Sequence, residues 1–174
     1  MLNIEKAQNI LNMVINEYPS LYSDMIELKM SDHFCLETYN IFNDSVIHIG
    51  KMDYQSKFVK WLNKYLKNEY GLDANKHMYR NFNDVFAFLH EVGHLYYFDI
   101  LKENEKNEGY KEYKNEKFYN YNEAWESYRK IPNEKIADEF AVTFMNNNII
   151  KIWAVMEDIT IEKAKEEYDF WNEF

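Results

Sequence analysis

Two histidines four residues apart, with a glutamate directly after the first, are the residues of this sequence best suited to chemistry: His90-Glu91-Val92-Gly93-His94. Residues at this spacing on an α-helix differ by about 40° around the helix axis and by roughly 6 Å along it. Their imidazoles can therefore converge on one zinc ion, which binds histidine nitrogen at about 2.0–2.1 Å. His90 and His94 are the predicted first two ligands of a metal site.

Glu91 follows His90 by about 100° of helical rotation, which is too far round for a third ligand but suits contact with a water molecule on the metal. Zinc lowers the pKa of such a water toward neutrality, and a neighbouring carboxylate can accept its proton. We therefore predict that Glu91 is the general base of a hydrolytic reaction. One alternative is a chance match on a surface helix. Another is a closed structural zinc site, which would need four protein ligands.

A third metal ligand must come from elsewhere, and the acidic cluster of residues 133–140 is the best source in the chain. Glu134 is the preferred candidate, and the alternative is an ordinary first-turn glutamate favoured by the helix dipole. Asp138 lies one helical turn further on the same face. It can accept the free ring N–H of His90 and so fix the tautomer of that histidine. Glu139 is expected to point elsewhere.

Hydrolysis also needs an electrophile that stabilises a developing oxyanion, and three residues are within reach in the sequence: Tyr128, Tyr121 and His77. Tyr128 is the preferred candidate because it closely precedes the helix that carries the third ligand. The alternative is a packed tyrosine ring, since the chain has 15 tyrosines. The histidines at 33 and 48 are expected to be surface or hydrogen-bonded core residues.

Composition predicts one globular domain over residues 1–174, with 47% hydrophobic residues and a net charge of -10. This charge argues against nucleic acid or an anionic membrane as the main partner. Cys35 is the only cysteine, which excludes an internal disulfide and a cysteine-rich zinc site, so we expect it to be a buried small hydrophobe. We find neither a secretory signal pattern nor a membrane-length apolar run, and expect a cytoplasmic protein.

Apolar residues at helical spacing predict a mainly helical protein. The expected helices occupy residues 2–18, 54–70, 81–100, 123–130, 133–145 and 160–174. Pro19 and Gly71 should end the first two helices. Asn81 or Asn83 should cap the helix that carries the two histidines, and Asn133 should cap the one that carries Glu134. A break is expected at Pro132.

Three other segments depart from this helical pattern. Residues 36–49 are rich in β-branched and aromatic residues and predict a hairpin that turns at Asn43-Asp44. Residues 102–122 are polar and contain Gly109, so we predict a loop that could act as a lid. Gly93 costs about 1 kcal/mol relative to alanine within a helix, which suggests close approach of another backbone or a substrate. The predicted fold is α+β, mostly helical, with a short sheet or hairpin beside the active-site helix.

The HEVGH motif is followed downstream by the pattern E-x-x-A-D-x-F-A, formed by Glu134, Ala137, Asp138, Phe140 and Ala141. Together the two motifs resemble those of the ImmA/IrrE metallopeptidases, over roughly residues 41–145. The resemblance implies a small zincin fold, zinc bound by His90, His94 and Glu134, and Glu91 as the base. The chain departs from the family in a long tyrosine-rich connector before Glu134 and in Phe144-Met145-Asn146 after the second motif. These departures concern substrate specificity more than metal binding.

Three functions follow from these features. The leading prediction is a zinc-dependent endopeptidase for one specific protein or peptide. The resemblance implies that this substrate could be a transcriptional repressor encoded nearby, often in a mobile element. The second is a zinc-binding regulatory or partner-binding module without efficient turnover. The third is a structural helical domain that uses no zinc. The sequence does not indicate an oligomeric state.

Overall fold

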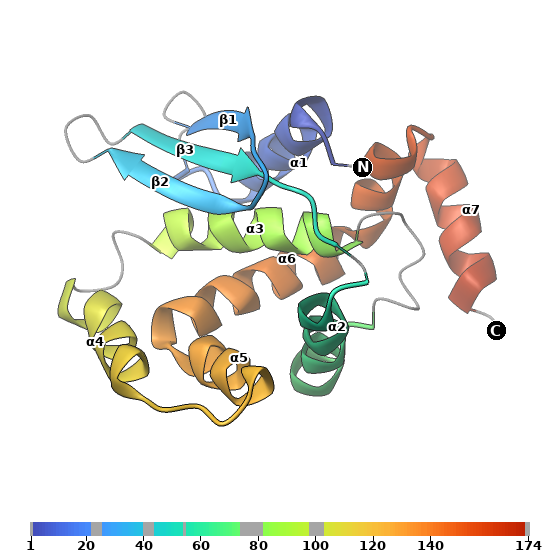
Figure 1. Ribbon diagram of the computed structural model, residues 1–174. Helices are drawn as coiled ribbons and strands as arrows, with labels where there is room; N and C mark the ends of the chain where they lie inside the picture. Colours follow the sequence, from blue (N-terminus) through green and yellow to red (C-terminus); the bar gives the residue numbers. More distant parts are fainter. Residues whose placement is uncertain are drawn as a thin grey trace.

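The computed structural model describes residues 2–21, 26–39, 44–53, 55–73, 82–97 and 103–172. The helices within these residues are α1 Ile4–Glu17, α2 Lys57–Tyr70, α3 Phe82–Tyr97, α4 Glu103–Asn115, α5 Tyr121–Lys130, α6 Pro132–Glu157 and α7 Ile161–Asn172. The strands are β1 Ile26–Met30, β2 Cys35–Tyr39 and β3 Asp44–Ile49. The predicted α+β class, mostly helical with a small sheet, is confirmed (Figure 1).

The sheet has the order β1-β3-β2, with β3 in the middle. β3 pairs antiparallel with β2, which confirms the predicted hairpin, and pairs parallel with β1, which was not predicted. Asp44 begins β3 opposite Tyr39 rather than forming the turn, and Asn43 lies outside the described residues. One side of the sheet lies against α3, and α1 contacts β1 (Figure 1).

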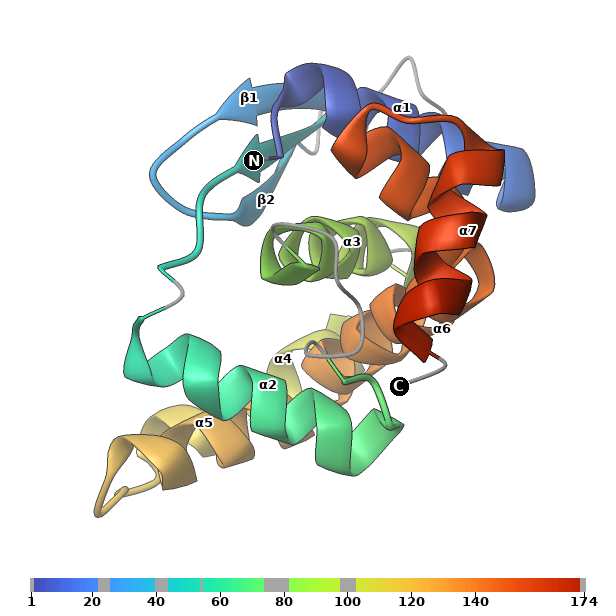
Figure 2. The same cartoon turned by 90° about the vertical axis from the view of Figure 1, so that its right-hand side faces the viewer.

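Helix α3 lies between the sheet and α6 and supplies much of the core (Figure 2). An apolar stripe of this helix is buried at Phe82, Val85, Phe86, Leu89 and Val92, and Leu95 near its end is partly buried. The prediction for the glycine in this helix is also confirmed, since a Cβ atom on Gly93 would lie 3.0 Å from both Cα and O of Ala137 in α6. Glycine therefore allows the two helices that carry the candidate ligands to cross closely.

The predicted helix ends are confirmed at α1, which stops just before Pro19, and at α2. Gly71 ends α2 in the left-handed conformation with φ 69°. The predicted cap of α6 was wrong, because the helix begins at Pro132 with Ile131 at the N-cap, and Asn133 lies inside the first turn. Proline suits this first helical position because its φ is already near the helical value and its missing N–H is not needed.

At the start of α3, only one of the two predicted caps can be tested. Asn83 lies inside this helix and is buried, so it is not the cap, and Asn81 lies outside the described residues. At the other end of the chain, α6 is longer than predicted and bends at Asn148, and the predicted last helix is present as α7. Within the described part of the chain, no helix combines the length and apolar character needed to cross a membrane.

The largest error concerns residues 102–122, which were predicted to be a loop. Residues 103–115 form α4, and α5 already begins at Tyr121. Helix α4 packs through Gly109, where an added Cβ atom would lie 2.8 Å from Cγ2 of Ile131 and 3.1 Å from Cδ of Pro132. This glycine, which suggested a loop in the sequence, is therefore the point where α4 meets the junction of α5 and α6.

Candidate metal centre

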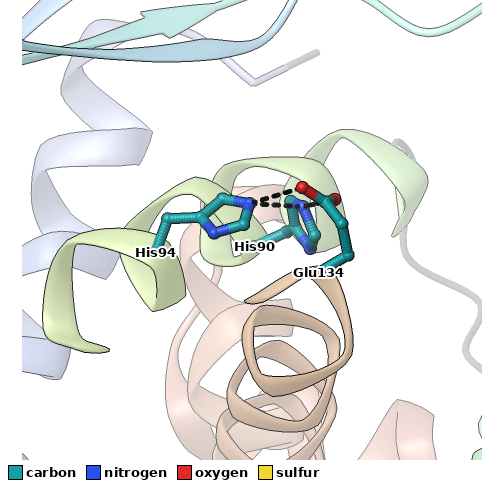
Figure 3. A group of neighbouring side chains, drawn as sticks. All are labelled: His90, His94 and Glu134. Carbon is teal, nitrogen blue, oxygen red and sulfur yellow. Dashed lines mark hydrogen bonds and ion pairs between the residues drawn. The ribbon is translucent and has the colours of Figure 1, made fainter. Parts of the chain in front are cut away.

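His90, His94 and Glu134 meet where α3 crosses the first turn of α6, and their side chains point toward one another (Figure 3). The Nε2 atoms of the two histidines are 3.0 Å apart. Oε2 of Glu134 lies 3.1 Å from Nε2 of His90, and Oε1 lies 3.5 Å from Nε2 of His94. His90 and Glu134 are buried, and His94 is partly buried. Helix α6 thus adds a carboxylate to the pair of histidines that α3 carries.

These separations fit a single metal ion. Bonds of about 2.0–2.1 Å in a tetrahedral arrangement place neighbouring ligand atoms about 3.3 Å apart. The separations of 3.0, 3.1 and 3.5 Å lie close to that value, and those of Glu134 belong to its two different oxygens, Oε2 toward His90 and Oε1 toward His94. One ligand atom from each of the three residues lies within 4.8 Å of the others. Two imidazole nitrogens and one carboxylate oxygen are also a donor set of catalytic zinc sites. The group could therefore hold a metal ion.

Asp138 lies behind His90, as predicted. Its Oδ1 atom is 2.9 Å from Nδ1 of His90, so the ring N–H can donate to this carboxylate and leave Nε2 facing the other candidate ligands. The guanidinium of Arg129 contacts the same oxygen at 2.6 Å, and the hydroxyl of Tyr65 donates to Oδ2 at 3.3 Å. The fully buried carboxylate thus has partners on both oxygens.

Electrostatics give the three candidate ligands different protonation states in the metal-free protein. Burial and the charge of Arg129 lower the pKa of His90, but its hydrogen bonds with Asp138 and Glu134 outweigh them and raise it to about 9. Burial and the neighbouring His90 lower the pKa of His94 to about 4. Burial opposes ionisation of Glu134, yet the hydrogen bond with His90 and the charges of both histidines lower its pKa to about 2.

An open cleft of about 360 Å³ reaches this group, and His90 and Glu134 are among its lining residues. Glu91, the predicted base, also lines the cleft and is half-buried. Tyr128, the predicted oxyanion stabiliser, lines it as well. Burial and the nearby charge of Glu134 raise the pKa of the Tyr128 hydroxyl, so this group keeps its proton.

Among the other residues weighed from the sequence, those that the structure describes do not join this group. Tyr121 is 74% exposed and stacks on Trp125, and Cys35 is half-buried rather than a fully buried hydrophobe. His33 is exposed at the cleft, whereas His48 is half-buried in β3. His77 lies outside the described residues.

Like Tyr65, two further residues of the site were not predicted. Arg129 is buried and pairs with Asp138, and Tyr110 of α4 donates a hydrogen bond from its hydroxyl to Oε1 of Glu134. Arg129 lies at the end of α5, where a basic residue looks like an ordinary partner of the helix dipole. Tyr110 follows Gly109 in a segment without apolar periodicity, so the sequence carries no signal for it.

No protein-family model, curated protein or solved structure matches this chain. The fold and the site therefore define its class by themselves: a mostly helical α+β domain with a buried His-His-Glu group that could hold a metal ion. Membership of the ImmA/IrrE family stays a prediction, which rests on the two sequence motifs.

Proposed function

We propose that this protein is a zinc-dependent endopeptidase that hydrolyses a peptide bond in a specific protein. The observation that carries the proposal is the meeting of His90, His94 and Glu134 beside an open cleft, which His90, Glu134 and Glu91 line. A closed structural site would need a fourth protein ligand. The His, Cys, Asp and Glu side chains of the described residues add no fourth member to this group.

Each residue of the cleft has its own role in the proposed hydrolysis. A zinc ion held by the His-His-Glu group would act as a Lewis acid and lower the pKa of a water molecule. Glu91 accepts a proton from the attacking water and returns it to the departing amine, so that a carboxylate and an amine are the products. The protonated hydroxyl of Tyr128 donates to the oxyanion that develops on the substrate carbonyl. Asp138 holds His90 in the tautomer that keeps Nε2 available.

The substrate follows from the sequence resemblance, and both the substrate and the location are part of the proposal. A transcriptional repressor encoded near this protein is the first candidate, and the reaction would take place in the cytoplasm. The cleft supplies a base, Glu91, and a hydrogen-bond donor, Tyr128, beside the His-His-Glu group. This combination favours an enzyme over a module that only binds metal.

The decisive experiment replaces the base alone. Purified wild-type protein loaded with zinc is incubated with candidate repressors, and chelator-sensitive cleavage is followed by mass spectrometry. Glu91→Gln should keep its zinc content and thermal midpoint yet cleave about 10²–10⁴-fold more slowly, which is the usual range for loss of a general base. The matched control is Glu139→Gln on the exposed side of α6, which should cleave like the wild type.

Several results would contradict this function. Full activity of Glu91→Gln would contradict the proposed mechanism. Cleavage by zinc-free His94→Ala would contradict the proposed zinc dependence. A stable complex with an intact repressor would instead favour the regulatory module. Protein that binds no zinc would leave only the structural domain.

A further inference from the structure

We infer that Tyr110 is a positioning residue for the Glu134 carboxylate, and that α4 is thereby a fixed wall of the metal centre rather than a lid. The inference rests on the proposed metal site. The hydroxyl of Tyr110 donates to Oε1 of Glu134, while Oε2 of the same carboxylate lies 3.1 Å from Nε2 of His90. Oε1 therefore has a neighbour on α4, in addition to Nε2 of His94 at 3.5 Å, whereas Oε2 faces His90.

The direction of this hydrogen bond follows from the neighbouring groups. The side-chain amide of Asn133 donates to the Tyr110 oxygen at 3.4 Å, and an amide nitrogen can only donate. An ionised carboxylate can only accept, so the hydroxyl proton of Tyr110 is directed at Glu134. The chain of donors runs one way, from Asn133 through Tyr110 to the candidate ligand.

The backbone of α4 explains why Tyr110 can reach this position. Gly109 lies so close to Ile131 and Pro132 that an added Cβ atom would come within 2.8 Å of the Ile131 side chain. Ile131 is itself buried, so it has little room to move. Tyr110, the next residue along α4, therefore lies beside the first turn of α6, which carries Glu134.

This contact matters for metal binding because a glutamate side chain has several rotatable bonds. A hydroxyl that holds one oxygen restricts the rotation of the carboxylate and leaves the other oxygen facing His90. Groups that orient metal ligands in this way typically contribute a factor of about 10–100 to metal affinity. Without the hydroxyl, the ring of Tyr110 would still pack against Tyr128, but the carboxylate would be free to turn.

The test removes this one oxygen. Tyr110→Phe should bind zinc about 10–100-fold more weakly than the wild type in competition with a chromophoric chelator. The cobalt-substituted variant should also show a shifted visible absorption spectrum, because the geometry of the carboxylate ligand changes. The matched control is Tyr113→Phe, one turn further along α4, whose ring packs against Phe118 and Tyr128. It should keep the wild-type affinity and spectrum.

If circular dichroism shows that Tyr110→Phe does not fold, a second variant still tests the inference. Gly109→Ala changes no site side chain but should displace α4, and it should weaken zinc binding in the same direction. Wild-type affinity and spectrum in the folded variants would overturn the role of Tyr110 and leave the proposed enzyme intact. Failure of the wild-type protein to bind zinc would overturn the metal centre and this inference together.

Discussion

Arg129 and Asp138 form a buried ion pair that joins the end of α5 to the first turns of α6, with 2.6 Å between the guanidinium nitrogen and Oδ1. The same carboxylate oxygen lies 2.9 Å from Nδ1 of His90. A buried charge is costly unless it is paired, so each member of this group depends on the others. The orientation of His90 is thus tied to the packing of two helices that do not carry it.

This dependence predicts a large effect when Arg129 is removed. Arg129→Met keeps much of the side-chain volume but leaves the carboxylate of Asp138 without its strongest partner. The free energy of unfolding of the metal-free protein should fall by about 3–5 kcal/mol, as measured by urea titration. The control is Lys130→Met at the next, exposed position, which should stay within about 0.5 kcal/mol of the wild type. A similar small change in Arg129→Met would contradict the proposed dependence.

The crossing of α3 and α6 predicts an unusual response to Gly93→Ala. In an uncrowded helix this change should stabilise the protein by about 1 kcal/mol. Here the new methyl group would lie 3.0 Å from backbone atoms of Ala137, which cannot move aside as the end of a side chain could. We expect a net loss of about 1–3 kcal/mol in the free energy of unfolding. A thermal midpoint above that of the wild type would show that the helices are not held at this distance.

Helix α3 could be predicted from the sequence because several signals agree there. An apolar stripe runs from Phe82 to Val92, and the two histidines fall together on another part of the helix surface. Gly93 could be predicted as a point of close approach because a glycine is otherwise unfavourable in a helix. Each of these signals is local, so one stretch of sequence is enough to detect it.

The features that were missed depend on contacts between distant segments. β1 pairs in parallel with β3, and such a pairing leaves no turn signal between the strands. Helix α4 has no clear apolar stripe and is held in part by Gly109 against the α5–α6 junction. Tyr110 is one of 15 tyrosines, and only the packing of α4 distinguishes it from the others. Sequence periodicity carries no information about such contacts.

Removal of zinc should lower the stability of the wild-type protein, but not that of a variant that lacks one of the candidate ligands. Zinc at 100 times its dissociation constant should stabilise the native state by about 2.7 kcal/mol relative to the metal-free protein. A strong chelator should therefore lower the thermal midpoint of the wild type, and it should leave the midpoint of His94→Ala unchanged. His33→Ala is the control, because this exposed histidine lines the cleft but does not belong to the His-His-Glu group. It should respond to the chelator like the wild type.

Zinc binding at pH 7 should release about one proton, and the proton should come from His90. Its pKa of about 9 means that the metal-free ring carries both N–H protons at this pH, and one of them must leave before Nε2 can bind a metal. His94, with a pKa of about 4, and Glu134, with a pKa of about 2, are already deprotonated and release none. Zinc affinity should therefore rise with pH and level off above about pH 9.

Isothermal titration calorimetry in buffers with different ionisation enthalpies measures the number of protons released. The slope of observed enthalpy against buffer enthalpy should correspond to about one proton at pH 7 and should decrease as the pH approaches 9. Asp138→Asn should release fewer protons at pH 7, because it removes the negative charge that helps to keep His90 protonated. A wild-type slope of zero at pH 7 would mean that His90 is neutral before the metal arrives, which would contradict the ion pairs of His90 with Glu134 and Asp138 in the metal-free protein.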